Sequence, residues 1–201
     1  MHHRFRIYIV FLQKCIDSLA ARTPIEGKSR MADVLVRPAR RSDLPALVDI
    51  FNFYVENGHV TFDTEPNTVD KRVAWFESYG TGRYQLLVAE AGEGVVGCTY
   101  SSRYRPSAAF DFTVETSIYL NPAARARGTG TLLYGALFRR LTEQPVHLAV
   151  AAVALPNDAS LALHRKHGFE EVGTFREYAF KRGAWISSTW FQRPIGSASQ
   201  P

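Results

Sequence analysis

The pattern of hydrophobic and polar positions divides most of the chain into alternating strand-like and helix-like segments. After a short apolar run at residues 34–36, Ser42 is placed to cap a helix whose apolar positions recur every three or four residues as far as Asn57-Gly58. Thr68 opens a second helix with the same spacing. Runs rich in β-branched and aromatic residues then predict three strands, over residues 85–91, 95–102 and 110–120.

The second half of the chain continues this alternation. Leu133, Leu137 and Leu141 lie four residues apart and predict the buried face of a third helix. A buried strand is predicted over residues 146–155, a short helix over 158–167, and a final antiparallel pair of strands over 169–175 and 186–192. This order of strands and helices predicts one α+β domain, for which 201 residues are sufficient.

The two ends of the chain differ from this domain in composition. We expect residues 1–30 to be an N-terminal extension outside the fold, residues 31–196 to form the domain, and residues 197–201 to be a frayed tail. The apolar run at residues 7–12 is much shorter than the ~18–20 residues of a membrane-spanning helix, and no convincing signal-peptide cleavage site follows it. We therefore expect no membrane partner.

The net charge of +5 and the pI of about 9.4 raise the question of a nucleic-acid partner. Six of the 24 basic residues but only two of the 19 acidic residues lie in residues 1–30, so the rest of the chain is close to neutral. This distribution does not support a general polyanion-binding surface. The two cysteines, Cys15 and Cys98, lack the spacing of a metal site or a disulfide framework, and the cytoplasm is the expected location.

A basic, glycine-bearing loop connects the strand that ends near Leu120 to the following helix. The residues that define it are Arg125, Arg127, Gly128, Thr129 and Gly130. Glycines allow close backbone approach, and the first turn of a helix presents unpaired N–H groups, so the loop is suited to hold a pyrophosphate. The simpler alternative is a glycine-containing turn with solvated arginines. The spacing fits neither a Walker A loop nor a dinucleotide fingerprint, and it resembles the acyl-CoA loop of the GNAT acetyltransferase superfamily.

Five further segments resemble one family in this superfamily, the phosphinothricin and methionine-sulfoximine acetyltransferases. They lie in the order expected for that family, at residues 60–66, 113–120, 155–160, 164–169 and 180–185, and the resemblance covers about residues 34–195. It implies the GNAT fold, a mixed and mostly antiparallel central sheet with helices on both faces and a splay between the fourth and fifth strands. It also implies acetyl-CoA as co-substrate, whose pantetheine enters the splay, and a homodimer.

Glu115 is the candidate general base. An alkylammonium is charged at neutral pH, so a base must remove its proton before the amine can attack a thioester. Glu115 stands in an otherwise apolar strand, where desolvation raises a carboxyl pKa. The alternative is a strand glutamate that points to solvent. The family resemblance places the catalytic glutamate at this position.

The thioester carbonyl and the leaving thiolate require two further kinds of group. Backbone N–H groups of Ile118, Tyr119 and Leu120 are candidates to stabilise the developing oxyanion. His164 stands where many GNAT enzymes carry a tyrosine general acid, and a structural histidine is the equally weighted alternative. Asn157 and Ser160 share a helical face with His164 and are further candidates for cofactor contact. Neighbouring His167 has no companion ligand in the sequence pattern, so no zinc site is expected.

The amine substrate is less well defined by the sequence. Phe62 and Tyr100 match pocket positions of the family, although both also fit an ordinary aromatic core. Ser107 and Phe110 stand where the family usually has an arginine and a tyrosine, so a bidentate clamp for an anionic substrate group is lost at position 107 unless Arg105 or Arg103 replaces it.

The function expected from these residues is acetyl-CoA-dependent N-acetylation of the α-amine of a small amino acid or a close analogue. One alternative is acetylation of a protein N-terminus or another amine. Another is a catalytically silent acyl-CoA-binding module that regulates a partner, against which the retained Glu115 argues.

Overall fold

The computed structural model describes residues 34–92, 94–124 and 128–196. The expected extension at residues 1–30 and tail at residues 197–201 lie outside this range, and so do Arg125 and Arg127 of the basic loop. Among the described residues no helix is long and apolar enough to cross a membrane.

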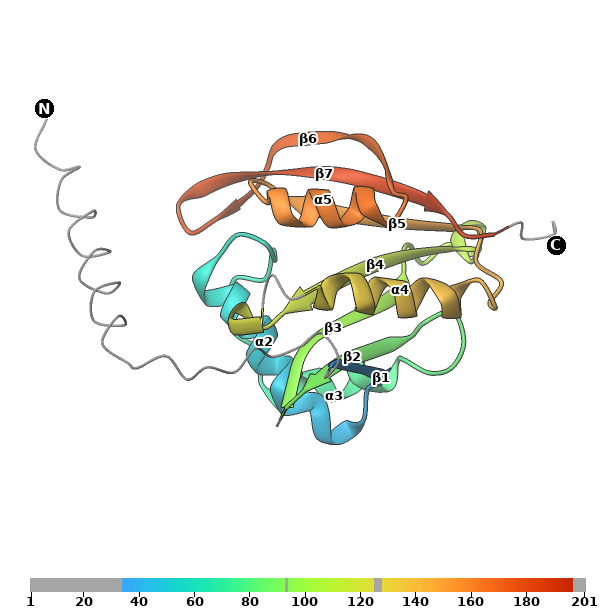
Figure 1. The fold of residues 1–201 in the computed structure, drawn as a ribbon. Helices are drawn as coiled ribbons and strands as arrows, with labels where there is room; N and C mark the ends of the chain where they lie inside the picture. Colours follow the sequence, from blue (N-terminus) through green and yellow to red (C-terminus); the bar gives the residue numbers. More distant parts are fainter. Residues whose placement is uncertain (1–33, 93, 125–127, 197–201) are drawn as a thin grey trace, which may run out of the picture. The chain divides into compact units, whose positions relative to one another are not determined.

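The described residues form one seven-stranded sheet with helices on both faces (Figure 1). The strands are β1 (Val34–Pro38), β2 (Leu86–Ala91), β3 (Gly94–Arg103), β4 (Thr113–Leu120), β5 (Leu148–Ala154), β6 (Glu170–Lys181) and β7 (Ala184–Pro194). The helices are α2 (Leu44–Asn57), α3 (Val69–Glu77), α4 (Thr129–Leu141) and α5 (Asp158–Lys166), with short 3-10 turns η2 (Arg41–Asp43), η3 (Ala108–Phe110) and η4 (Pro122–Ala124). The spatial order of the strands is β1-β2-β3-β4-β5-β7-β6.

The pairing is antiparallel everywhere except between β4 and β5. These two parallel strands pair over only three positions, and the last pair joins Glu115 to Val150. Beyond it β4 stays paired with β3 and β5 with β7, so the two halves of the sheet diverge. The predicted fold class is confirmed, including the splay between the fourth and fifth strands.

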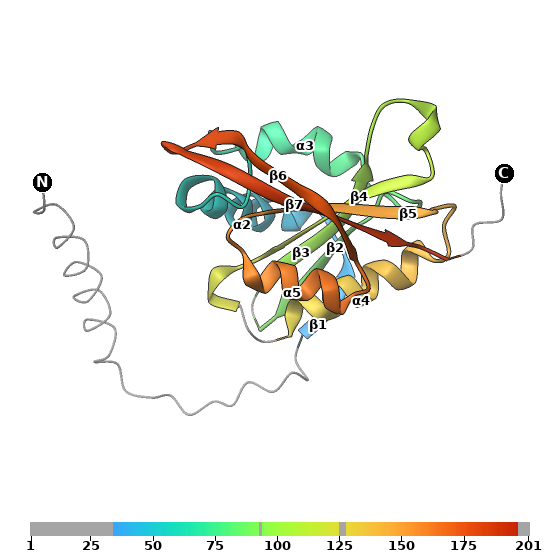
Figure 2. The same cartoon turned by 90° about the horizontal axis from the view of Figure 1, so that it is seen from above.

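The helices are divided between the two faces of the sheet, with α4 and α5 on one face and α2 and α3 on the other (Figure 2). Because side chains alternate along a strand, neighbouring strand residues enter different cores. Leu87 packs with α4 residues such as Leu137, whereas Leu86 and Val88 pack against Trp75 of α3. This division also fixes which β4 side chains face which helices.

Several predicted boundaries are correct and others shift for local reasons. The Asn57 end of α2 and the Thr68 cap of α3 are confirmed, since Thr68 Oγ1 accepts from the Lys71 N–H at 3.3 Å. Ser42, however, lies in η2, and Asp43 precedes α2 instead. The strand predicted from residue 110 begins only at Thr113, because residues 108–110 form η3.

The C-terminal strands are longer than predicted. They form a hairpin whose register shifts between Phe175 and Ala179, where Glu177 has a φ of 49°. A bulge adds a residue without ending the pairing, so the polar residues there interrupt the hydrophobic pattern but not the strand.

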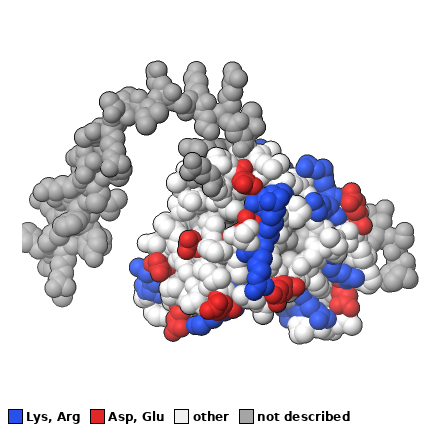
Figure 3. Space-filling model, turned by 90° about the horizontal axis from the view of Figure 1, so that it is seen from below, with Lys and Arg blue, Asp and Glu red and all other residues white. Residues whose placement is uncertain are grey.

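Charged side chains of both signs are interspersed on the face shown in Figure 3, which agrees with the near-neutral body expected from the sequence. One partly buried ion pair links β1 to the start of α2. The Arg37 guanidinium donates to both carboxylate oxygens of Asp43, at 2.7 and 2.9 Å, and to Glu90 at 2.6 Å. The Asp43 carboxylate also accepts from the Arg40 N–H at 2.7 Å. Asp43 is only 7% exposed, so this carboxylate fixes the chain between β1 and α2.

We predict that Asp43→Ala lowers the free energy of unfolding by about 3 kcal/mol, because it leaves part of a buried ion pair without its partner. The Arg37 guanidinium holds the pKa of Asp43 below its ordinary value. The stabilisation is therefore complete above the ordinary carboxyl pKa of about 4 and is lost as the pH falls through the lowered pKa. Urea unfolding of both proteins at pH 7 and in acid measures this.

Glu77→Ala is the matched control, because the Arg41–Glu77 pair is exposed on both sides and should contribute less than about 1 kcal/mol. Equal losses in the two variants would contradict the prediction.

Candidate functional site

A cavity of about 550 Å³ opens where β4 and β5 diverge. Its walls come from the end of α2 and the residues after it, from β4, from the end of β5 and from the start of α5. Seven residues singled out in the sequence line it: Glu115, Ile118, Tyr119, Leu120, Asn157, Ser160 and His164. The splay therefore brings together predicted residues of β4 and predicted residues of α5 and its cap.

Glu115 occupies the last paired position of β4, at the point where the cavity begins. Val114 and Ile118 belong to the core on the α4 side, whereas Tyr119 packs into the core on the α2 side. By alternation the Glu115 side chain points to the α2 face. Burial raises its pKa. A carboxylate with a raised pKa in a cavity is suited to accept a proton near neutral pH.

The backbone of β4 supplies hydrogen-bond donors to the same cavity. The Asn121 N–H donates to Val96 on the β3 side, so alternation directs the N–H groups of Ile118 and Leu120 towards the splay. The Leu120 carbonyl on that side accepts from the Tyr54 hydroxyl at 2.5 Å. Of the three N–H groups expected from the sequence, those of Ile118 and Leu120 therefore point into the splay, whereas the Tyr119 N–H points towards β3.

His164 is 3% exposed and is held at both ring nitrogens. Its Nδ1 lies 2.7 Å from the Ser160 carbonyl oxygen, which can only accept, so Nδ1 carries a proton. Its Nε2 lies 2.9 Å from the Tyr134 hydroxyl. Burial lowers the pKa of His164, so the ring is neutral and Nε2 accepts the hydroxyl proton.

Two helix N-termini border the cavity region. Asn157 caps α5, since its Oδ1 accepts from the Ser160 N–H at 3.2 Å. Gly128 precedes α4 with a φ of 76°, a left-handed conformation that favours glycine. A Cβ at Gly130 would lie 3.0 Å from the Leu163 side chain, so this glycine lets α4 approach α5 closely. Thr129 begins α4 and is buried.

The five predicted substrate-contacting residues do not line this cavity. Phe62 is 43% exposed and packs edge-on against Tyr178. Tyr100 lies in the aromatic core beside Trp75 and Tyr79. The other three lie on the connection between β3 and β4, where Arg105 stacks over Phe110 and Ser107 is exposed at the start of η3.

Among the lining residues that the sequence did not single out as site residues are Tyr54, His59 and Tyr134. Tyr54 fits an apolar position of the helix pattern that ends at Asn57-Gly58, and Tyr134 lies beside Leu133 in a pattern typical of a core helix. His59 Nε2 lies 3.0 Å from the Pro156 carbonyl oxygen and so connects the end of α2 to the turn before α5. These contacts join residues far apart in sequence, and no local spacing indicates them.

Comparison with known proteins agrees with the family resemblance described from the sequence. Residues 36–190 match the family model described as "Acetyltransferase (GNAT) domain". A phosphinothricin N-acetyltransferase of Streptomyces coelicolor is 42% identical, over 82% of this chain and 98% of that protein. An L-methionine sulfoximine/L-methionine sulfone acetyltransferase of Pseudomonas paraeruginosa is 35% identical, over 78% of this chain and 92% of its own length.

A solved structure is also similar. The phosphinothricin acetyltransferase of Sinorhizobium meliloti in complex with AcCoA superposes with a TM-score of 0.79 at 32% identity, covering 84% of this chain and 93% of that one.

We predict that His164 remains the neutral Nδ1–H tautomer at pH 7 and does not titrate near 6.5, the ordinary value for histidine. Nitrogen-15 NMR of the imidazole reports both the protonation state and the tautomer. Tyr134→Phe should shift the Nε2 resonance, because it removes the donor at 2.9 Å, and should leave Nδ1 protonated. A His164 ring that is doubly protonated at pH 7, or that carries its proton on Nε2, would contradict the assignment.

Proposed function

The chain belongs to the GNAT acetyltransferase family, and we propose that its cavity transfers the acetyl group of acetyl-CoA to the α-amine of a small amino acid or amino-acid analogue. The protein is an acetyl-CoA-dependent N-acetyltransferase. The observation that carries the assignment of the reaction to this cavity is the position of Glu115, a carboxyl with a raised pKa at the point where β4 and β5 part.

Acetyl-CoA fits the α4 side of the splay. The N-terminus of α4 carries a partial positive charge, and it is suited to receive the pyrophosphate next to Gly128. The N–H groups of Ile118 and Leu120 point into the gap that pantetheine would occupy. Arg125 and Arg127 stay predicted contacts, as do Thr129, Gly130, Asn157 and Ser160.

The amine reaches the thioester from the other face. Glu115 points to the α2 face and removes a proton from the substrate ammonium, and the neutral amine then attacks the thioester carbonyl. The C–N bond forms, negative charge develops on the carbonyl oxygen, and the β4 N–H groups stabilise it. The C–S bond then breaks, the nitrogen of the new amide loses its extra proton, and the departing thiolate takes up a proton. The contacts of His164 support its structural role, because its Nε2 accepts from Tyr134 and holds that hydroxyl in the cavity wall.

The experiment that tests this function is a thiol-release assay with acetyl-CoA and a panel of amines. The panel contains phosphinothricin, methionine sulfoximine, methionine sulfone, unmodified amino acids and a short peptide with a free N-terminus. Release with the small amino-acid analogues supports the proposal. Release only with the peptide would favour the protein N-terminus alternative, and binding without release would favour the silent module.

We predict that Glu115→Gln lowers turnover by roughly 10²–10⁴-fold, the range typical of general base catalysis. Acetyl-CoA affinity should change little, since the carboxyl points away from the α4 face. In the wild type the rate should fall as the pH drops through the raised pKa of Glu115, and the variant should lack this dependence. Exposed Glu143→Gln is the control for a simple loss of charge. Near-normal turnover of Glu115→Gln at pH 7 would exclude Glu115 as the base.

A homodimer in the cytoplasm is part of the proposal. Large apolar side chains gather on the edge hairpin formed by β6 and β7, with Phe175 58%, Phe180 59% and Trp185 62% exposed. Exposed aromatic rows on an edge strand favour pairing with a second surface. The two cysteines, without disulfide spacing, are consistent with a reducing compartment. Residues 31–196 are proposed to be sufficient for activity.

We predict that Ser107→Arg increases the efficiency ratio of phosphinothricin to methionine sulfone by about 10–100-fold, since a guanidinium can form two charge-assisted hydrogen bonds to an anionic group. Ser107 does not line the cavity of its own chain. Such an increase would therefore require the β3–β4 connection of a second copy to reach the cavity, so the assay is paired with light scattering. The control is Ser78→Arg, because Ser78 is exposed and does not line the cavity. Ser160→Arg is not a suitable control, because Ser160 lines the cavity. An unchanged ratio would remove position 107 from the substrate site.

A further inference from the structure

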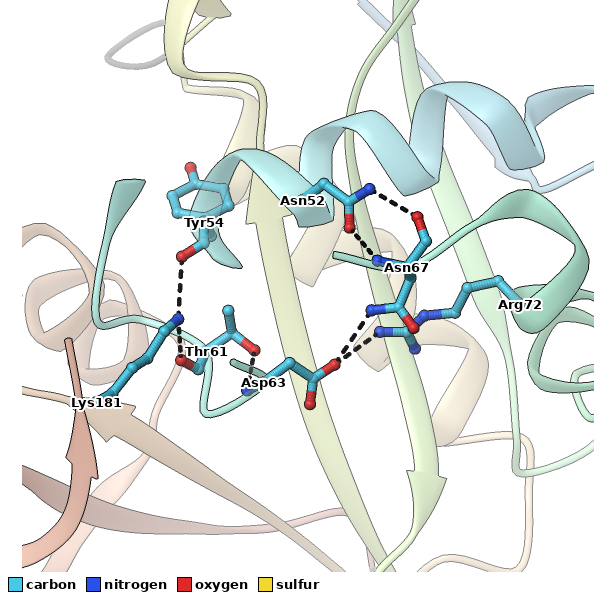
Figure 4. A network of polar contacts seen from close by, with 7 residues as sticks. All are labelled: Asn52, Tyr54, Thr61, Asp63, Asn67, Arg72 and Lys181. Atoms are coloured by element: carbon cyan, nitrogen blue, oxygen red, sulfur yellow. Dashed lines mark hydrogen bonds and ion pairs between the residues drawn. The ribbon is translucent and has the colours of Figure 1, made fainter. Parts of the chain in front are cut away.

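Lys181, the last residue of β6, is a buried lysine that no part of the proposed reaction uses. It is 5% exposed, and its ammonium donates to the carbonyl oxygens of Thr61 at 2.9 Å and Tyr54 at 3.4 Å (Figure 4). Among the described residues it forms no ion pair within 4.0 Å, so its direct partners are backbone carbonyls, while the Asp63 carboxylate acts on it from further away. A buried cation is costly unless hydrogen bonds satisfy its donors, and here the two carbonyls do so.

The two carbonyls that Lys181 binds lie at either end of one cavity wall. Tyr54 on α2 lines the cavity, and so do Gly58, His59 and Val60, which directly precede Thr61. A single ammonium therefore fixes the wall segment at both of its ends. An ammonium with three donors can bind two carbonyls of different orientation at once.

Other polar contacts hold the later part of the same connection between α2 and α3. Asn52 and Asn67 exchange two hydrogen bonds of 2.8 Å, and Asp63 pairs with Arg72 at 3.3 Å (Figure 4). These contacts link the connection to its own two helices. Lys181, by contrast, links the cavity wall to the distant β6–β7 hairpin, where neighbouring Arg182 also donates to the Glu56 carbonyl.

A further hydrogen bond connects this wall to β4, the strand that carries Glu115. Tyr54 accepts from Lys181 through its carbonyl and donates from its hydroxyl to Leu120 at the end of β4. The wall lies on the α2 face of the sheet, the face to which Glu115 points, whereas α4 and α5 cover the opposite face (Figure 2). The wall is therefore on the side from which the amine approaches.

We infer that Lys181 is a positioning residue for the amine substrate. It acts through the carbonyls of Tyr54 and Thr61 to set the wall formed by Gly58–Val60 against Glu115. This inference rests on the proposed function, because it assigns the wall to the amine. The inference distinguishes the two substrates, because a change at Lys181 should weaken the use of the amine and leave acetyl-CoA binding unchanged.

Lys181→Met tests this, because methionine keeps an unbranched side chain and removes the ammonium. The expected result is a rise of about tenfold in the KM of the amine, with kcat and the acetyl-CoA Kd within about twofold, as for a displaced substrate-positioning group. Amide hydrogen exchange should accelerate at residues 58–61 and not on α4. Lys71→Met, the same change at an exposed lysine of α3, is the matched control. It should change neither the KM of the amine nor the hydrogen exchange at residues 58–61.

Three results would overturn the inference. The first is an unchanged KM for the amine, and the second is an equal loss of amine and acetyl-CoA binding. The third is a variant that does not fold, which would show that Lys181 is needed for the fold in general. If the wild type acetylates no amine of the panel, the proposed function fails instead, and hydrogen exchange alone decides whether Lys181 holds the wall.

Discussion

The parallel pairing of β4 with β5 ends at Glu115 and Val150, and the geometry of the site depends on that interruption. Backbone groups in the interior of a sheet are normally paired, because an unpaired buried N–H or carbonyl is costly. Here β3 and β7 keep the outer sides of the two strands paired while the inner sides separate. The Tyr54 hydroxyl satisfies one inner carbonyl, that of Leu120. The N–H groups of Ile118 and Leu120 are left directed into the cavity, where a substrate can use them.

In the proposed reaction the same interruption separates the two reactants. Alternation along β4 directs Val114 and Ile118 to the α4 face and Glu115 and Tyr119 to the α2 face. A helix N-terminus suited to phosphate lies at the start of α4, whereas Glu115, the proposed base, faces α2. One strand thus presents backbone donors to one substrate and a base to the other. Further pairing between β4 and β5 beyond Val150 would close the gap and remove access to both the backbone donors and the base.

The sequence predicted those parts of the molecule whose signals are local. The strand and helix order, the Thr68 cap and the position of Glu115 in an apolar strand all follow from short-range patterns, and the family resemblance supplied the splay. Ser42 was a wrong cap because Asp43 is held by Arg37 on a neighbouring strand, a partner that local spacing does not reveal. For the same reason the sequence did not identify His59, Tyr54 or Lys181 as residues of the site. Each acts through a backbone carbonyl elsewhere in the fold, and any residue type can supply a carbonyl.

Two ionisable groups, the partly buried Glu115 and the buried Lys181, carry costs of burial that a structure selected only for stability would avoid. If they paired with each other, each would offset the other's cost, but the ammonium would lower the pKa of Glu115 and weaken it as a base at neutral pH. Instead Lys181 directs its donors to two neutral carbonyls, and burial alone raises the pKa of Glu115. Using backbone carbonyls as the partners of the lysine keeps the wall fixed without adding a charge partner to the base. Among the residues that the structure describes, Glu115 forms no ion pair, so no positive partner opposes the rise of its pKa on burial.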